Sequence, residues 1–258
     1  MLPIPPRNLV VPQPAKFQQP NPADIQASIG ACLANGERLL DDAMMLEFQE
    51  PASTRLMVSM LAQEEFAKAF LLFLVKQEII PWDSELLRAM NNHSCKQLVA
   101  IVIEYLDPQW ETLDELTKML DAEYALDGAF PKPVSSALNI LYHEKMQRGD
   151  FSDDNDYDPQ VVNVATGERD KVKQNAVYVR IDRSGRVQST PSSVTMDAAN
   201  EEYEKARRYR WFVGSLASDG PRDSEQFRKL REAMKIVYWQ KYKPISFPSE
   251  ARDNNETK

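Results

Sequence analysis

Glycine, cysteine and histidine are scarce in this sequence of 258 residues, which contains 8 glycines, 2 cysteines and 2 histidines. A P-loop and a dinucleotide-binding glycine fingerprint are both absent, and no Cys-x-x-Cys pair suggests a zinc site. Cys32 and Cys95 each fall inside a helical pattern, which indicates a reducing compartment and no structural disulfide. The sequence therefore predicts neither a metal nor a cofactor.

Long apolar runs are also missing. The richest stretch, residues 66–75, is too short to span a bilayer and contains Lys68. The first residues lack the basic and apolar regions of a signal peptide, so we expect a cytoplasmic protein without a membrane segment. The net charge of -8 disfavours broad binding to duplex DNA, which normally requires a basic surface. Basic residues do gather within 205–243, either as a local anion-binding surface or as solvated helix faces.

What the sequence does contain is helical periodicity. Apolar residues recur at helical spacing over 24–48, and 55–80 is apolar on nearly all sides, which is typical of the central helix of a bundle. Asn21 or Asp24 is expected to cap the first helix. The later helical patterns are 84–105, with a break near Asn91-Asn92, then 112–126 and 135–147.

The second half of the chain has a different pattern. An acidic loop and one β-hairpin are predicted within 150–194, because residues 176–181 alternate and Arg183-Ser184-Gly185 suits a turn. Ser53 or Thr54 is expected to cap the central helix, and Thr195 a helix that ends near Leu216. The predicted organisation is a proline-rich arm (1–23), a helical bundle (24–149), the loop and hairpin (150–194), a C-terminal helical pair packed on the bundle (195–243) and a polar tail (244–258).

Three segments resemble one known family. Leu61-Ala62-Gln63-Glu64-Glu65-Phe66-Ala67-Lys68-Ala69 is similar to the A-x-E-E-x-x-K-A helix of AbiV-like and other HEPN proteins. His93-Ser94-Cys95-Lys96 follows at the start of a later helix, similar to the family's His-x-x-Lys element. Lys173-Gln174-Asn175-Ala176-Val177-Tyr178-Val179 resembles its K-x-x-x-L-Y-V strand segment. The resemblance implies a mainly α fold: a HEPN-like antiparallel helical bundle with one small β-hairpin and additional C-terminal helices.

The resemblance also implies a candidate chemistry. HEPN ribonucleases carry an arginine followed, after four to six residues, by a histidine, and Arg88 and His93 have this spacing, although Ala89 replaces a polar residue usual in active members. His93 would act as a general base or acid in metal-independent cleavage of RNA, and Arg88 would stabilise charge on the phosphate. Asn91 and Asn92 would supply further donors. In the family, two protomers of a homodimer build one composite site.

Two roles are open for the charges of the central helix. Glu64 and Lys68 have the i, i+4 spacing of a structural ion pair. Alternatively, Glu64, Glu65 and Lys68 face a groove near His93 and orient its imidazole. Lys96 joins this supporting set through the resemblance.

Other sites are less well supported by the sequence. A di-iron centre requires Glu-x-x-His pairs, which neither His93 nor His143 provides. Cys95 is poorly placed to react with His93, because helical positions two apart do not face each other. Aromatic residues in 203–212 and 238–242 could stack on RNA bases, but they suit a core or an interface better.

The leading hypothesis is therefore an antiphage, abortive-infection protein of the AbiV type, for which the resemblance implies a ribonuclease that acts on RNA as a homodimer. The alternative is a non-catalytic HEPN-like protein that binds a phage or host protein. Its binding surface would be the acidic loop Asp150 to Asp158 or the C-terminal helices.

Overall fold

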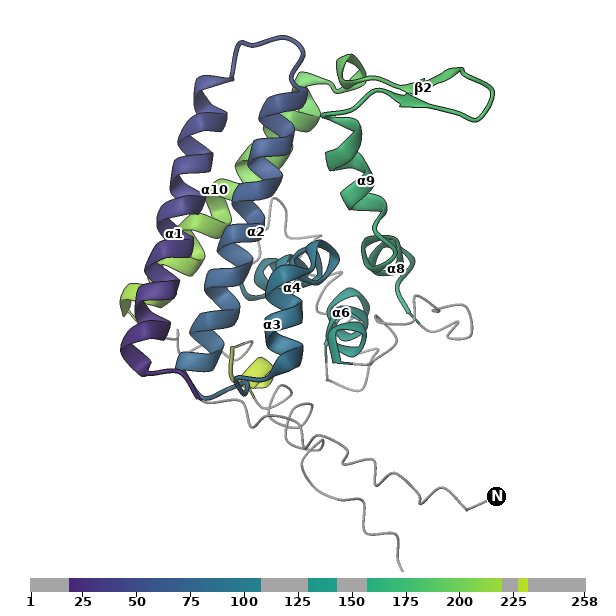
Figure 1. Ribbon diagram of the computed structural model, residues 1–258. Helices are drawn as coiled ribbons and strands as arrows, with labels where there is room; N and C mark the ends of the chain where they lie inside the picture. The colour runs from purple at the N-terminus through teal and green to yellow at the C-terminus, as the bar shows by residue number, and fades with distance from the viewer. Residues whose placement is uncertain (1–18, 108–129, 143–156, 220–226, 232–258) are drawn as a thin grey trace, which may run out of the picture.

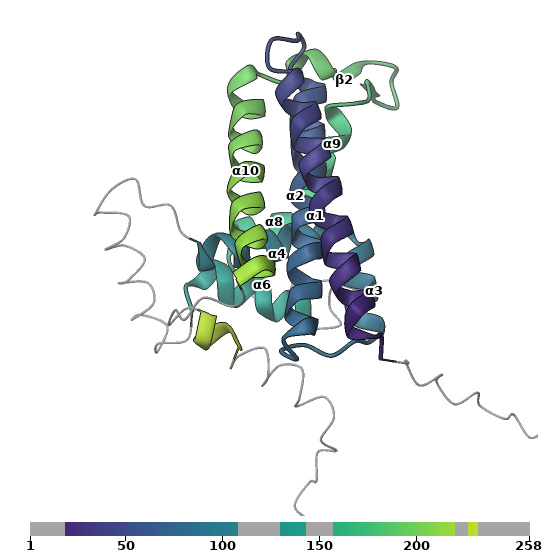
Figure 2. The ribbon, with the colours of Figure 1, turned by 90° about the vertical axis from the view of Figure 1, so that its left-hand side faces the viewer.

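The computed structural model describes residues 19–107, 130–142, 157–219 and 227–231. Three long helices, α1, α2 and α10, form a bundle, and shorter elements lie beside it (Figure 1). Figure 2 shows α10 running alongside the α1–α2 pair. The elements are α1 (Pro22–Met45), α2 (Ser53–Lys76), α3 (Ser84–Asn91), α4 (His93–Leu106), α6 (Lys132–Tyr142), α8 (Pro159–Ala165), α9 (Glu168–Asn175), β1 (Arg180–Ile181), β2 (Val187–Ser189), η1 (Pro191–Ser193) and α10 (Met196–Asp219), and residues 227–231 are also helical.

The mainly helical fold predicted from the sequence is confirmed. The N-cap of α1 is Asn21, whose side chain accepts a hydrogen bond from the Ala23 amide, and Pro22 occupies the first helical turn. Within the described residues, no helix combines the length and the apolarity needed to cross a membrane.

Helix α2 is the centre of the bundle, as its sequence predicts. It packs against α1, α10 and α4, so apolar residues around its whole circumference are buried. Phe70 on α2 lies against Phe212 on α10, with ring centroids 6.3 Å apart. The buried apolar residues of α2 include Leu56, Met60, Ala62, Phe66, Ala67, Ala69, Phe70, Leu71, Leu72, Phe73 and Leu74.

The start of α2 differs from the prediction. Ala52, rather than Ser53 or Thr54, is the N-cap, and it makes no side-chain hydrogen bond. Ser53 is buried as the first helical residue, so its hydroxyl is placed for packing inside the bundle instead of capping. Burial of the helix N-terminus has overridden the local preference for a polar cap.

The predicted break after Asn91 is confirmed. Helix α3 begins after Asp83, whose carboxylate accepts a hydrogen bond from the Leu86 amide at 2.9 Å. Asn92 interrupts the helical path and caps α4, because its side-chain oxygen accepts the Cys95 amide at 3.0 Å. This capped break places His93 at the first position of α4.

The region predicted as a loop with a hairpin contains two further helices, α8 and α9. Asp158 caps α8 with its side chain, and Gly167 joins the two helices at a positive φ of 86° that glycine adopts without strain. The sequence does not predict these helices because both are short: α8 has seven residues, too few to show an apolar period, and α9 is almost entirely polar. Of the predicted acidic loop, only Tyr157 and Asp158 lie within the described residues.

The predicted hairpin is confirmed as the antiparallel pair β1 and β2. Arg180 is opposite Ser189, and Ile181 is opposite Val187. Asp182 closes the turn by accepting hydrogen bonds from the Ser184 and Arg186 amides. Thr195 caps α10 as expected, through a 3.2 Å bond from the Ala198 amide.

Some predictions concern residues outside the described ranges. They are the arm up to residue 18, the helix over 112–126, His143, most of the acidic loop, the last helix apart from 227–231, and the polar tail.

Close packing between α1 and α2 gives a testable contrast between two glycines. A Cβ added at Gly36 would lie 2.6 Å from the Phe66 ring, which is fully buried and cannot yield easily. Gly36→Ala should therefore lower the free energy of unfolding, since overpacking costs ~1–3 kcal/mol and helix propensity returns ~1 kcal/mol at most. Gly30→Ala, where the added Cβ meets nothing within 4 Å, should instead raise it by roughly 0.5–1 kcal/mol. Urea denaturation measures both, and equal effects at the two positions would contradict this packing.

Candidate functional site

A buried carboxylate lies at the junction of three helices. Glu64 on α2 has a side chain only 4% exposed, and two lysines from other helices contact it. Lys96 of α4 places its Nζ 2.6 Å from Oε2, and Lys173 of α9 places its Nζ 2.7 Å from Oε1. Burial alone would raise the pKa of Glu64, but the hydrogen bonds and charges of Lys173 and Lys96 outweigh it and hold the pKa below its ordinary value. Glu64 is therefore an ionised carboxylate inside the protein.

The same carboxylate holds His93. Nδ1 of His93 lies 2.7 Å from Oε2 of Glu64, whereas the imidazole side chain is 49% exposed. Nδ1 has two neighbours that need opposite roles of it: the ionised carboxylate of Glu64 can only accept a proton, whereas the ammonium of Lys173, 2.9 Å away, can only donate one. Since that ammonium is already directed to the carboxylates of Glu64 and Asp170, we assign the proton to Nδ1, which leaves Nε2 unprotonated in the neutral ring. The geometry thus presents an oriented imidazole with a proton-accepting nitrogen.

Further polar contacts hold helix α9, which carries Lys173, in place. Nζ of Lys173 lies 2.9 Å from both the His93 Nδ1 and the Asp170 Oδ1. Arg169, one residue before Asp170, donates to Gln63 at 3.0 Å and to Glu202 at 2.6 Å. Helix α9 is therefore joined to both α2 and α10 by charged hydrogen bonds.

Arg88 lies next to this cluster but does not bond to His93. It is half-buried in the last turn of α3, and its charge acts on Cys95 in the first turn of α4. Arg88 and His93 are both described by the structure, and no hydrogen bond joins them. The guanidinium and the imidazole thus lie on either side of the α3–α4 junction without a hydrogen bond between them.

Cys95 itself is a packed thiol. Burial raises its pKa to about 11, although the charges of Arg88 and Lys96 oppose the rise. A thiol with this pKa stays protonated at neutral pH, which agrees with its predicted structural role.

The two asparagines predicted as donors have local backbone partners. Asn92 caps α4, as described, and Asn91 donates through its side chain to the Leu87 carbonyl at 2.7 Å. Their side chains therefore shape the α3–α4 junction that carries His93.

The predicted pairing of Glu64 with Lys68 is wrong. Lys68 bonds instead to Glu65 at 2.5 Å, and both charges influence Cys32 on α1. The reason is a competition, since Lys96 and Lys173 reach Glu64 from α4 and α9 and occupy both its oxygens. Of the three charges proposed to orient His93, only Glu64 contacts it.

Sequence reasoning missed Lys173, Asp170 and Arg169 as site residues. The usable signals were the i, i+3 spacing of Asp170 and Lys173 and the position of Lys173 at the start of the third family-like segment. The resemblance predicts a strand for that segment, whereas Lys173 lies in helix α9. The described residues contain no cluster of three or more His, Cys, Asp or Glu side chains that could hold a metal ion.

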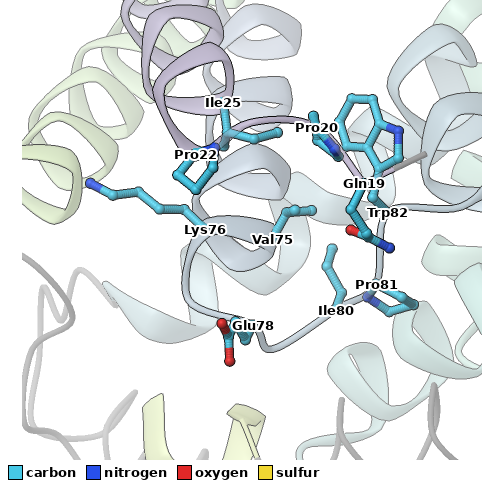
Figure 3. A pocket seen from close by; sticks show the side chains of 10 residues that line it. All are labelled: Gln19, Pro20, Pro22, Ile25, Val75, Lys76, Glu78, Ile80, Pro81 and Trp82. Atoms are coloured by element: carbon cyan, nitrogen blue, oxygen red, sulfur yellow. The ribbon is translucent and has the colours of Figure 1, made fainter.

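A mostly apolar cavity lies away from this cluster. It has a volume of about 720 Å³ and opens between the start of α1 and the end of α2 (Figure 3). Its walls are mostly apolar, and Lys76 and Glu78 supply the charges at its border. None of the predicted site residues lines it. The lining residues are Gln19, Pro20, Pro22, Ile25, Val75, Lys76, Glu78, Ile80, Pro81 and Trp82.

The lowered pKa of Glu64 predicts a specific acid sensitivity. Its stabilising contribution is fully present above its ordinary pKa of 4.5 and is lost as the pH falls through the lower folded-state value. At neutral pH, Glu64→Gln should lower the free energy of unfolding by about 3 kcal/mol, because it removes the carboxylate that Lys96 and Lys173 share and leaves Lys173 with Asp170 alone. Below pH 4.5 the free energy of unfolding of the wild type should fall faster with pH than that of the Glu64→Gln variant. The difference between the two proteins should therefore shrink.

Denaturant unfolding at several pH values measures this difference. Glu168→Gln is the control, because Glu168 pairs with Lys171 at the surface of α9, where an ion pair contributes less than about 1 kcal/mol. A Glu64→Gln effect that stays constant down to about pH 3 would show that Glu64 is not held ionised.

Comparison with known proteins identifies the family. The family model for AbiV, a HEPN domain, matches residues 24–211. The match includes α1, α2, α4, α9 and most of α10, and hence every residue of the cluster around Glu64. No curated protein and no solved structure matches the chain. Since the family model covers well over half of the sequence, this chain belongs to the AbiV family of HEPN-like abortive-infection proteins.

Proposed function

We propose that this protein is an antiphage effector that cleaves RNA without a metal ion, with His93 as the proton-transferring group. One observation carries the proposal: an exposed imidazole is oriented through Nδ1 by a buried, ionised Glu64, 2.7 Å away. A carboxylate that fixes the tautomer of a histidine leaves its other nitrogen ready to accept a proton. The effector acts in the cytoplasm, where its RNA substrates are found.

The reaction is an internal transesterification. Nε2 of His93 takes the proton of a ribose 2′-hydroxyl, and the 2′-oxygen then forms a bond to the adjacent phosphorus. The bond from phosphorus to the 5′-oxygen breaks, and that oxygen receives a proton from a protonated imidazole. The products are a 2′,3′-cyclic phosphate and a 5′-hydroxyl. The transesterification as proposed uses no electron acceptor and no metal ion.

Two imidazoles are required at once, one as base and one as acid. Because each chain offers one such histidine at this junction, the protein acts as a homodimer in which the second protomer supplies the other His93. Arg88 stabilises the negative charge of the phosphate from the same junction. Lys96 and Lys173 serve a different purpose, because their ammonium groups are directed to Glu64 and hold it ionised.

A second candidate function is non-catalytic binding of a phage or host protein. The observation that favours it is the hairpin, where Tyr178 and Ile181 are 65% and 62% exposed. Exposed apolar side chains of this size on one element often mark a protein-binding surface. Phage protection by variants of His93 and Arg88 distinguishes this function from catalysis.

The catalytic proposal is tested by cleavage of RNA in the presence of EDTA. His93→Ala should lower the rate by about 10²- to 10⁴-fold, as expected for loss of a general base, and added imidazole should restore part of it. Arg88→Ala should lower it by about 10²- to 10³-fold. Arg38→Ala, which removes an exposed arginine paired with Asp42 on α1, is the control and should be unchanged. Full phage protection by the His93 and Arg88 variants would favour the binding function instead.

The positioning role of Glu64 has its own readout. Glu64→Gln removes the partner of Nδ1 but no group that touches RNA, so kcat should fall by about 10- to 100-fold with KM nearly unchanged. The assay is run at a temperature where circular dichroism shows the variant folded. A rise in KM with an unchanged kcat would place Glu64 in substrate binding and contradict the assignment.

A further inference from the structure

The hairpin that follows α9 combines an exposed aromatic ring with exposed arginines. Tyr178 lies just before β1 and is 65% exposed. Arg180, Arg183 and Arg186 are exposed as well. We call these four residues the hairpin surface. In Figure 1 the hairpin extends away from the upper end of the bundle, so a large partner has access to it.

The positive charge of the hairpin surface is only partly neutralised. Asp182 is the one acidic residue of the hairpin, and it pairs with Nε of Arg186 at 3.1 Å. Arg180 has the neutral side chain of Asn175 as its partner. Within the part of the chain that the structure describes, the Arg183 guanidinium makes no hydrogen bond and no ion pair. Two arginines are thus available to an anion, in a chain whose net charge is -8.

The hairpin begins close to the candidate site. Lys173 of α9 places its Nζ 2.9 Å from Nδ1 of His93, and the Tyr178 amide donates a hydrogen bond at 2.9 Å to the carbonyl of Gln174, the residue after Lys173. Because five residues of extended chain span at most about 18 Å, the backbone of Tyr178 lies within that distance of Lys173. One strand of a few nucleotides can therefore reach both Tyr178 and His93.

The basic residues around Glu64 are already used within the protein. Lys96 and Lys173 are directed to the Glu64 carboxylate, and Arg169 donates to Gln63 and Glu202. Contacts with phosphates supply much of the affinity of a protein for nucleic acid. The cations that hold a strand beside His93 must therefore come largely from outside the cluster, and the free arginines of the hairpin are near enough to do so.

We propose that the hairpin surface binds an unpaired stretch of RNA next to the bond that His93 is proposed to cleave. One base stacks on the ring of Tyr178, and Arg180 and Arg183 contact the neighbouring phosphates. A base inside a duplex is already paired and stacked, so the ring takes only an unpaired base. The choice of RNA as the ligand rests on the proposed function, and the hairpin adds a binding surface that this function does not include.

Binding is measured by fluorescence anisotropy with the full chain carrying His93→Ala, so that the RNA stays intact. A labelled, unstructured RNA of about 20 nucleotides is long enough for a typical single-strand site. Tyr178→Ala should raise the dissociation constant by about 5- to 100-fold, as expected for the loss of one stacked base, and Tyr178→Trp should preserve the affinity. Trp211→Ala is the matched control, because it removes a similarly exposed aromatic ring from α10, and it should change nothing.

The dependence of binding on salt tests the arginines. Arg183→Ala should reduce the slope of log affinity against log salt by about 0.7, the value for one phosphate contact with a single strand. Arg38→Ala lowers the net charge of the chain by the same amount, but on α1, and should leave the slope unchanged. The same sequence in a duplex should bind at least about tenfold more weakly than the single strand.

Cleavage by the chain with His93 intact separates this inference from the proposed function. Tyr178 touches the RNA but not the reacting atoms, so Tyr178→Ala should raise KM and leave kcat nearly unchanged. Binding through the hairpin without any cleavage would remove the catalytic function and leave the inference standing. Cleavage with the same KM in the wild type and in Tyr178→Ala would do the reverse.

The inference is overturned by a wild type that does not bind the single strand, by equal affinities of Tyr178→Ala and Trp211→Ala, or by a duplex bound as tightly as the single strand. Hairpin variants that keep their affinity for RNA but lose phage protection would also overturn it. The partner of the hairpin would then be a protein, as in the second candidate function.

Discussion

The structure depends on a charge placed inside a hydrophobic helix. Helix α2 is surrounded by α1, α10 and α4, and a lone carboxylate in such a position would be strongly destabilising. Glu64 is tolerated because Lys96 and Lys173 bring two ammonium groups to its two oxygens. The two lysines that neutralise this charge join α4 and α9 to α2. The contact of Lys96 also brings His93, three residues before it, to the edge of the cluster.

The contribution of such a cluster is mainly to specificity. Removing two charges from water costs about as much as their attraction returns, so a buried ion pair is weak evidence for stability. It does penalise every arrangement in which one partner is missing. Sliding α9 along α2 by one turn would separate Lys173 from Glu64 and would also break the bonds from Arg169 to Gln63 and Glu202. The polar cluster therefore defines the register of α9, which has few apolar residues of its own.

The long helices and the hairpin could be predicted from the sequence because their signals are local. Apolar spacing, Asn21 as a cap, and Asn92 at the break each act within a few residues. The partners of Glu64 could not be predicted in this way. Lys173 is 109 residues away in the sequence, and the local i, i+4 rule favoured Lys68 instead. An isolated helix would have followed that rule, but the tertiary contacts prevailed because they satisfy a buried carboxylate.

The sequence predicts His93 as a candidate site residue, but it does not predict the environment of the imidazole. Its spacing from Arg88 is a property of the sequence, but orientation by Glu64 depends on how α4 crosses α2. Asn92 links the local sequence to this environment, because by capping α4 it fixes His93 at the first helical position. There the imidazole contacts the buried carboxylate and stays half exposed to solvent. A histidine one turn further along α4 would be buried like Gln97, and one before the break would lie on α3. The position of a single helix start thus decides whether this imidazole contacts both the buried carboxylate and solvent.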